Sequence, residues 1–249
     1  MKFVRLLLFE LLELFERKKV LSSLFEKDLI RQRLLSEGFV LLPRYFDEDF
    51  VMEILDELET KGPTIYNWSD DLGSDKRCYQ AEKKMPTLER FLCDSLINDN
   101  AKWFYGKQRL SSFVLLNRLI PVPGNYGSGG GWHRDSPTRH QFKAILYLTD
   151  VTDKTGPFQI IPRSNRKRFI LRDAFKLNEA AKYRFTEEEI KEITNFKEYE
   201  VKNITGKRGS LLLVDTKSYH RGMPIMDGER IAATIYFFNS KIPKHMIHG

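Results

Sequence analysis

Residues 129–137 read GGGWHRDSP, and in this stretch His133 and Asp135 are separated by a single residue. Side chains alternate along an extended chain, so these two side chains point to the same side. A second histidine, His220, follows the apolar run GSLLLVD at residues 209–215. Two imidazoles and one carboxylate are the set that holds a non-haem Fe(II) ion on one face and leaves the opposite positions open. We therefore predict that His133, Asp135 and His220 bind a metal and are the catalytic residues.

The order of these residues carries more weight than the His-x-Asp pair, because such pairs also occur by chance. The pair precedes one predicted strand, the later histidine follows another, and Arg230 lies ten residues beyond it. The alternative is that His133 and His220 are polar residues at the mouth of a barrel that binds no metal. The remaining histidines are poorer ligand candidates, because they fall in a turn or in the C-terminal tail: His140, His245 and His248.

From Leu110 onward the sequence has the texture of a β protein. Short runs rich in β-branched and aromatic residues alternate with Gly, Pro and Asp: residues 111–122, 141–151, 156–163, 196–203, 209–216 and 229–238. Six such strands separated by turns predict a sandwich or jelly roll. A helical insertion interrupts them at about 173–193, where Thr186 and Glu189 predict a capping box. The predicted fold class is therefore mainly β with flanking helices, a double-stranded β-helix barrel of the cupin type.

The first 109 residues are predicted to be a largely helical support for this barrel. Helical periodicity covers residues 29–39, 47–62 and about 87–105, and Asp47 is a plausible N-cap. A short strand is expected at 38–43 and a polar loop at 67–77, NWSDDLGSDKR. No domain boundary is visible, so we predict a single domain over residues 1–249 with a β-helix core at 110–240.

Three blocks carry a family resemblance: GGGWHRDSP, then TGPFQIIPRSN at 155–165, then GSLLLVDTKSYHRGMPIMDGERIAATIYFF at 209–238. Their order and texture resemble the phytanoyl-CoA dioxygenase family of Fe(II)/2-oxoglutarate oxygenases, over about residues 110–239. The resemblance implies Fe(II) as the metal, 2-oxoglutarate as co-substrate, and molecular oxygen.

Arg230 is the predicted anchor of the co-substrate. Alternation on its strand puts Arg230, Ala232, Thr234 and Tyr236 on one face. A guanidinium matches a carboxylate with two hydrogen bonds and keeps its charge, and the family resemblance implies that the carboxylate is the distal one of 2-oxoglutarate. The alternative is a surface arginine at a strand start. The Asp227-Gly228 pair predicts a hairpin that joins this strand to the His220 segment.

Three further residues are weaker candidates for co-substrate binding. By position in the resembling family, Asn117 lies on the strand before the iron loop and Tyr147 on the strand after it. Thr234 shares the face of Arg230 and could donate its hydroxyl. Ordinary strand packing explains Asn117 and Tyr147 about as well.

The charge balance favours an anionic partner. Lys and Arg number 41 against 34 for Asp and Glu, a formal net charge of +7. Part of the excess is local: Arg163, Arg166, Lys167, Arg168 and Arg172. This segment is either a solvated loop face or a cationic rim that attracts an anionic substrate. No nucleic-acid-binding signature is present, so nucleic acid is not expected as a partner.

The first 20 residues predict an amphipathic helix with leucines and phenylalanines between glutamates. It docks on the body, pairs with a second subunit to give a homo-oligomer, or lies in a membrane interface. Signal-peptide features and membrane-spanning apolar runs are missing from the sequence, and the two cysteines suit a reducing compartment. We predict a cytoplasmic protein, with peripheral membrane contact as the alternative.

These features predict an Fe(II)- and 2-oxoglutarate-dependent dioxygenase that hydroxylates an unactivated C–H bond. A carboxylate at Asp135, where Gly or Ala would open a position for halide, favours hydroxylation over halogenation. The expected substrate is a small molecule or a carrier- or glycan-linked one, with an anionic group as the favoured chemistry. Two alternatives stay open: a cupin-like metalloenzyme that does not use 2-oxoglutarate, and a non-catalytic barrel that binds a ligand.

Overall fold

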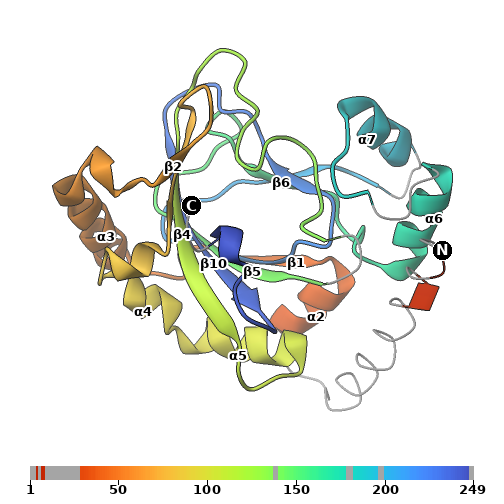
Figure 1. Cartoon of the computed structure of the whole chain (residues 1–249), viewed down its shortest axis with the longest axis horizontal. Helices are drawn as coiled ribbons and strands as arrows, with labels where there is room; N and C mark the ends of the chain where they lie inside the picture. Colours follow the sequence, from red (N-terminus) through yellow and green to blue (C-terminus); the bar gives the residue numbers. More distant parts are fainter. Residues whose placement is uncertain are drawn as a thin grey trace.

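The computed structural model describes residues 4, 7–8, 29–136, 140–177, 182–195 and 199–246. Its strands form two antiparallel sheets, one of seven strands in the order β1-β8-β5-β10-β4-β3-β2 and one of three in the order β7-β6-β9. The two sheets are the walls of a double-stranded β-helix, and helices surround them (Figure 1). The predicted fold class is confirmed.

The strands of the large sheet come from both halves of the chain: β1 (Phe39–Leu42), β2 (Trp68–Ser69), β3 (Asp75–Tyr79), β4 (Ser111–Leu119), β5 (Phe142–Tyr147), β8 (Leu211–Asp215) and β10 (Arg230–Phe238). The small sheet contains β6 (Phe158–Ile160), β7 (Lys202–Ile204) and β9 (His220–Gly222). Each of the six runs predicted as strands after residue 110 contains or overlaps one of these.

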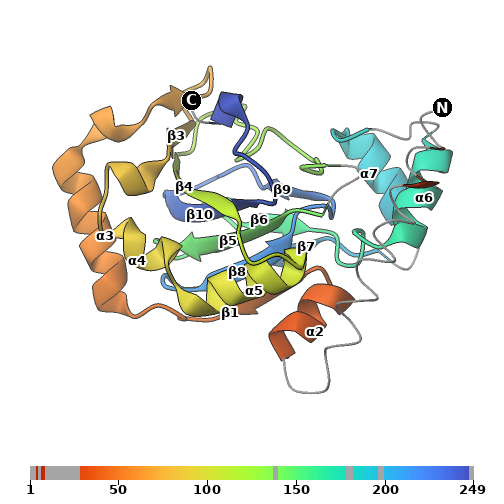
Figure 2. The same ribbon diagram turned by 60° about the horizontal axis from the view of Figure 1, so that its bottom comes forward.

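The helices are short, and three 3-10 turns accompany them. The α-helices are α2 (Leu29–Ser36), α3 (Glu48–Lys61), α4 (Leu88–Leu92), α5 (Ser95–Tyr105), α6 (Lys167–Lys176) and α7 (Glu187–Thr194). The 3-10 turns are η1 (Pro63–Ile65), η2 (Ala81–Lys83) and η3 (Lys244–Met246). Both views place α6 and α7 at the end of the molecule opposite α3 (Figures 1 and 2).

Alternation along β10 separates a packing face from a chemical face. One set of residues joins the outer core: Ile231, Ala233, Ile235 and Phe237. The other set lines a cavity between the two sheets: Arg230, Ala232, Thr234 and Tyr236. Successive residues of β10 thus alternate between the outer core and the cavity wall, as expected for a strand with different surroundings on its two faces.

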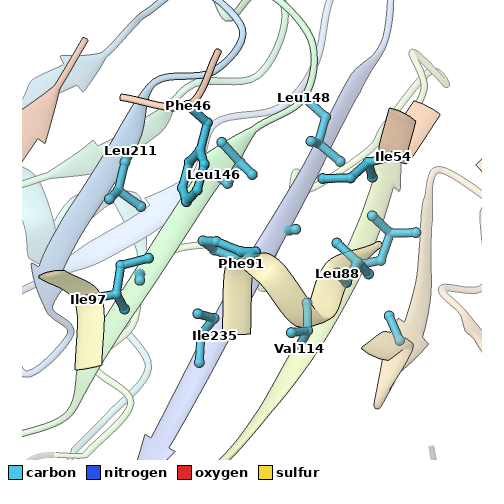
Figure 3. Close-up of a cluster of buried hydrophobic side chains, with 14 of the residues drawn as sticks. Phe46, Ile54, Leu88, Phe91, Ile97, Val114, Leu146, Leu148, Leu211 and Ile235 are labelled. Atoms are coloured by element: carbon cyan, nitrogen blue, oxygen red, sulfur yellow. The ribbon is translucent and has the colours of Figure 1, made fainter. Parts of the chain in front are cut away.

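Helices α3, α4 and α5 cover the outer face of the large sheet. Their apolar side chains meet those of β4, β5, β8 and β10 in one core cluster, part of which Figure 3 shows. Phe91 of α4 is fully buried there, with its ring 5.7 Å from that of Phe46 in an edge-on arrangement. A second, smaller core fills part of the space between the sheets: Ile145, Tyr147, Val151, Phe158, Ile160, Ile204, Leu212, Val214 and Ala232.

Capping explains where the N-terminal helices begin. Asp47 accepts a hydrogen bond from the backbone N–H of Phe50 at 2.8 Å, which confirms it as the N-cap of α3. The helical run predicted at 87–105 is divided into α4 and α5, because Asp94 adopts a non-helical conformation and caps α5 through the N–H of Ile97.

The prediction of a polar loop at residues 67–77 was wrong. Strands β2 and β3 form a hairpin there, and β3 pairs with β4 in the large sheet. Asp75, Arg77 and Tyr79 alternate along β3 and all line the cavity. The segment is polar because one face of it meets that cavity.

The predicted hairpin at Asp227-Gly228 was also wrong in its pairing. Strand β9, which begins at His220, pairs with β6 in the small sheet, whereas β10 pairs with β4 and β5 in the large sheet. The chain therefore crosses from one wall of the barrel to the other between His220 and Arg230. As a result, the two residues lie on facing sheets.

The helical insertion begins earlier than predicted. Helix α6 starts at Lys167 instead of near residue 173, so it includes most of the basic segment. The predicted capping box is confirmed at the start of α7, where the side chains of Thr186 and Glu189 bond each other's backbone N–H groups.

Most of the predicted N-terminal helix lies outside the described residues. Val4, Leu7 and Leu8 are described, and they are helical and exposed. The single domain over residues 1–249 stays a prediction. None of the helices within the described ranges is long and apolar enough to cross a bilayer.

Replacing Phe91 by alanine tests the packing of α4 on the sheet. The fully buried ring leaves a cavity when it is removed, so we expect Phe91→Ala to lower the free energy of unfolding by about 3–5 kcal/mol in a urea titration. The matched control is Phe175→Ala at a residue 62% exposed, with an expected change within about 0.5 kcal/mol. Equal losses from the two variants would contradict this packing.

Candidate metal centre and co-substrate cavity

His133 and His220 are direct partners across two antiparallel segments. The N–H of each donates to the carbonyl of the other, at 2.9 and 3.0 Å. Paired residues of this kind place their side chains on the same side, and the two ring centroids are 4.2 Å apart. The His133 segment thus lies beside β9 of the small sheet and is bridged on its other side to Arg184.

Asp135 completes the cluster that the sequence predicted. Its Oδ1 atom lies 3.7 Å from Nε2 of His133 and 3.9 Å from Nε2 of His220. The ligand atoms of the three residues all lie within 4.8 Å of one another. Neighbouring ligand atoms of a six-coordinate ion are about 3 Å apart, so each carboxylate–imidazole distance is within about 1 Å of the value needed. The donor set and its spacing fit a non-haem iron ion.

The hydrogen bonds of the two imidazoles direct their free nitrogens at the cluster. Nδ1 of His133 faces the carbonyl of Gly131 at 2.8 Å, and Nδ1 of His220 faces that of Ser218 at 2.9 Å. A carbonyl can only accept, so each Nδ1 carries the proton and each Nε2 presents a lone pair. Both rings are therefore held in the tautomer that binds a metal.

Burial prepares these residues to bind a cation without losing protons. It lowers the pKa of His133, and together with the neighbouring imidazole it lowers the pKa of His220 to about 3. Burial opposes the charge on Asp135, but the Lys143 ammonium and the two neighbouring imidazoles together outweigh it and hold the pKa of this carboxyl below its usual range. The neutral imidazoles and the charged carboxylate are the forms that ligate.

Gly129 allows the glycine loop to lie against the metal site. Its φ of +88° falls in the left-handed region, and a Cβ there would lie 2.6 Å from Cε1 of His133. The loop is also fixed by Arg184, whose guanidinium donates to the carbonyls of Gly129 and Gly130 at 2.7 and 3.0 Å. This loop therefore packs on the imidazole as a wall of the site.

Arg134, between the two predicted ligands, points away from them and anchors the loop. Its guanidinium lies 3.6 Å from the ring centroid of Tyr219, donates to the carbonyl of Ser164 at 2.9 Å, and approaches Asp173 of α6. Asp173 in turn accepts from the hydroxyls of Tyr219 and Tyr199, at 3.1 and 3.2 Å. One buried network thus holds the residues next to both histidines.

The cluster opens into a cavity of about 540 Å³ between the sheets. The helical insertion contributes to its rim, because Tyr183 and Arg184 line it just before α7. The segment containing them pairs with the segment that carries His133 and Asp135. Arg134 N–H donates to the carbonyl of Tyr183, and Phe185 N–H donates to that of Trp132. Access to the metal ligands is therefore shaped by the insertion.

Arg230 lies in this cavity on the wall opposite β9. It is 5% exposed, so the alternative of a surface arginine is excluded. Its terminal nitrogens donate to the carbonyl of Gly156 and, at 3.4 Å, to Oδ1 of Asn117, while its Nε is buried without a hydrogen-bond partner. An unpartnered donor on a buried cation fits a carboxylate ligand. Binding of 2-oxoglutarate by Arg230 stays a prediction.

The weaker candidates are placed differently. Asn117 lines the cavity beside Arg230 and donates to Asp75 at 2.7 Å, and Thr234 also lines it. Tyr147 is buried in the inner core, where its hydroxyl donates to the carbonyl of Ile204 at 2.7 Å. Tyr147 does not line the cavity. It is the cross-strand partner of Ala232, and its hydroxyl already has a partner.

The basic segment at 163–172 does not contribute to the cavity lining. Arg163 pairs with Glu37, and Arg166 donates to the carbonyl of Ser36 at 2.6 Å. The cations that line the cavity beside Arg230 are others: Arg77, Arg134, Lys143 and Arg184. Neither Lys143 nor Arg77 was predicted. Alternation within FKAILY and DKRCY was the available signal, because it places both on inward-facing positions.

The lowered histidine pKa values predict that metal binding releases few protons. At about pH 6, two imidazoles with the ordinary pKa would release about 1.5 protons, whereas imidazoles that are already neutral release almost none. We expect fewer than about 0.5 protons per Co(II) bound, from calorimetric titrations in two buffers of different ionisation enthalpy. The Asp135→Ala variant serves as the blank. Release of one or more protons would contradict the proposed protonation states.

Comparison with known proteins places the fold. EctD from S. alaskensis with bound Fe has a TM-score of 0.63 at 18% identity, covering 86% of this chain and 79% of that one. The epimerase SnoN, in complex with Fe3+, alpha ketoglutarate and nogalamycin RO, has a TM-score of 0.62 at 17% identity, covering 84% of this chain and 82% of that one. HygX from Streptomyces hygroscopicus, with nickel, 2-oxoglutarate and hygromycin B bound, has a TM-score of 0.61 at 14% identity, covering 85% of this chain and 87% of that one. These TM-scores show a shared fold.

A search of curated proteins found no match for this chain. The profile of the phytanoyl-CoA dioxygenase family matches residues 34–230, which is 197 of the 249 residues. The matched region contains His133, Asp135, His220 and Arg230. The chain therefore belongs to the phytanoyl-CoA dioxygenase family of enzymes that use Fe(II), 2-oxoglutarate and molecular oxygen.

Proposed function

We propose that this enzyme hydroxylates an unactivated C–H bond of a small or conjugated substrate. The observation that carries the proposal is the common cavity of the three-residue metal site and the buried, partly unpartnered Arg230. A metal-binding barrel without 2-oxoglutarate has no need of such a guanidinium. The arrangement supports a dicarboxylic co-substrate held at both ends.

The two sheets contribute different parts of the proposed site. His133, Asp135 and His220 would hold Fe(II) by three ligands on one side and leave its other side toward the cavity. Arg230, from the facing sheet, would hold the distal carboxylate of 2-oxoglutarate, and Ala232 beside it is small enough to leave room. Iron bound here would supply the oxygen chemistry. One atom of O2 enters succinate as 2-oxoglutarate loses carbon dioxide, and the other atom enters the substrate.

The identity of the third ligand supports hydroxylation. Asp135 would supply a carboxylate to one coordination position of the metal, so that position would be closed to a halide ion. Its side chain is 16% exposed and those of His133 and His220 are 12% and 4% exposed, which limits access of water to the ligands. A fixed, largely buried ligand set suits transfer of an oxygen atom to a C–H bond placed beside it.

The polar lining of the cavity supports a substrate with an anionic group. Arg77 is paired with Asp75 at 2.6 Å and Lys143 with Asp135 at 2.6 Å, while Arg184 at the rim donates to carbonyls. A metal bound by Asp135 would neutralise part of the carboxylate charge that faces Lys143. The ammonium would then be less fully compensated and would favour an anionic group in the cavity. Since SnoN and HygX were solved with a second organic ligand beside the co-substrate, this fold accommodates both.

Substitution of Arg230 separates the co-substrate site from the metal site. We expect Arg230→Met to weaken 2-oxoglutarate binding by about 100-fold, because two charge-assisted hydrogen bonds are lost, and to leave Fe(II) affinity within about threefold. The measurement is an anaerobic titration with Fe(II) and then 2-oxoglutarate, following the visible charge-transfer band. Arg208→Met, at a surface arginine paired with Glu48, is the control. Unchanged 2-oxoglutarate affinity in Arg230→Met would favour a cupin-like metalloenzyme.

Isotope labelling tests hydroxylation itself. A compound that stimulates succinate formation is turned over under ¹⁸O₂, and we expect one labelled atom in succinate and the other in a new hydroxyl group of the product. Mass spectrometry of both molecules gives the result. Turnover that labels succinate but leaves the organic product free of ¹⁸O would show a different oxidative outcome and would refute the proposed hydroxylation.

A further inference from the structure

Lys143 is a buried lysine that the sequence did not mark as functional. It lies on β5, is 5% exposed, and lines the cavity together with Ile145. Taking an ammonium group out of water is costly unless an opposite charge faces it. The partner of Lys143 therefore indicates why a lysine is found on this wall.

That partner is the oxygen of Asp135 that faces away from the histidines. Nζ of Lys143 lies 2.6 Å from Oδ2, whereas Oδ1 is the atom near the two Nε2 nitrogens. The ring of Tyr236, the cross-strand neighbour of Lys143, supports the ammonium at 4.1 Å from its centroid. The two oxygens of one carboxylate are thus directed to two different partners.

We propose that Lys143 is a positioning residue that holds Oδ2 of Asp135, so that the carboxylate offers only Oδ1 to the metal. This inference rests on the proposed function, since it assumes an ion among His133, Asp135 and His220. Without this restraint the carboxylate can turn about its Cβ–Cγ bond. Oδ1 would then leave the position facing the two Nε2 nitrogens, and the ligand set would lose the placement of its third ligand.

Charge alone makes the opposite prediction. Lys143 and a divalent ion lie on either side of the same carboxylate, and their like charges repel. If Lys143 only neutralised Asp135, its removal would relieve that repulsion and strengthen metal binding. If it orients the carboxylate, its removal weakens metal binding. The sign of the change in affinity therefore distinguishes the two roles.

The experiment compares the full chain with Lys143→Met and Lys143→Arg, each freed of metal and titrated with Co(II) by calorimetry and visible spectroscopy. We expect Lys143→Met to bind Co(II) about 10- to 100-fold more weakly, with shifted cobalt bands as the carboxylate changes its coordination. Lys143→Arg keeps a cationic donor and should recover affinity to within about threefold of wild type. Lys202→Met, at an exposed position of β7, is the matched control and should match wild type.

Each contrary outcome has its own meaning. Equal or tighter Co(II) binding by Lys143→Met would overturn the positioning role and leave the proposed function intact. Equal weakening by Lys143→Met and Lys143→Arg would also overturn it, because a restored donor would then have no effect. Failure of the wild-type chain to bind Co(II) would overturn the metal centre and, with it, the role of Lys143.

Discussion

The reciprocal backbone hydrogen bonds between His133 and His220 are the constraint on which the site depends. They bring together residues 87 positions apart in the chain and fix which way both imidazoles face. Backbone pairing is directional and depends little on side-chain identity, so this register is set before any ligand binds. The carbonyls of Gly131 and Ser218 then orient the rings, and the loop with Gly129 packs against one of them.

A second constraint is the pairing of buried charges. Three cations on the cavity wall have these acceptors: Arg77 faces Asp75, Lys143 faces Asp135, and Arg230 faces carbonyl and amide oxygens. Unlike Arg77 and Lys143, Arg230 therefore has no carboxylate at hydrogen-bonding distance among the described residues. Since an isolated buried charge is costly, its environment favours an incoming carboxylate over water or an apolar group.

Local sequence patterns predicted the cluster of three candidate ligands and the strands, because both depend on short-range geometry. The spacing of His133 and Asp135 and the alternation on β10 can be followed residue by residue. Pairing between distant segments could not be predicted in this way. The hairpin of β2 and β3 joins the sheet through β4, and β9 pairs with β6 instead of β10. Likewise, the density of charge at 163–172 does not reveal which way Arg163 or Arg166 points.

The chain crosses from one sheet to the other between His220 and Arg230, so the inner core between the sheets affects the geometry of the site. The metal ligands belong to the small-sheet side and Arg230 to the large sheet, so a co-substrate held by both must span the gap between the walls. That gap is set where the sheets pack together, by residues such as Tyr147, Phe158 and Ala232. Because packed cores do not compress smoothly, a change of volume there alters the distance between the two ends of the ligand site. Packing in this small core thus fixes the separation of Arg230 from the cluster of His133, Asp135 and His220, in addition to stabilising the fold.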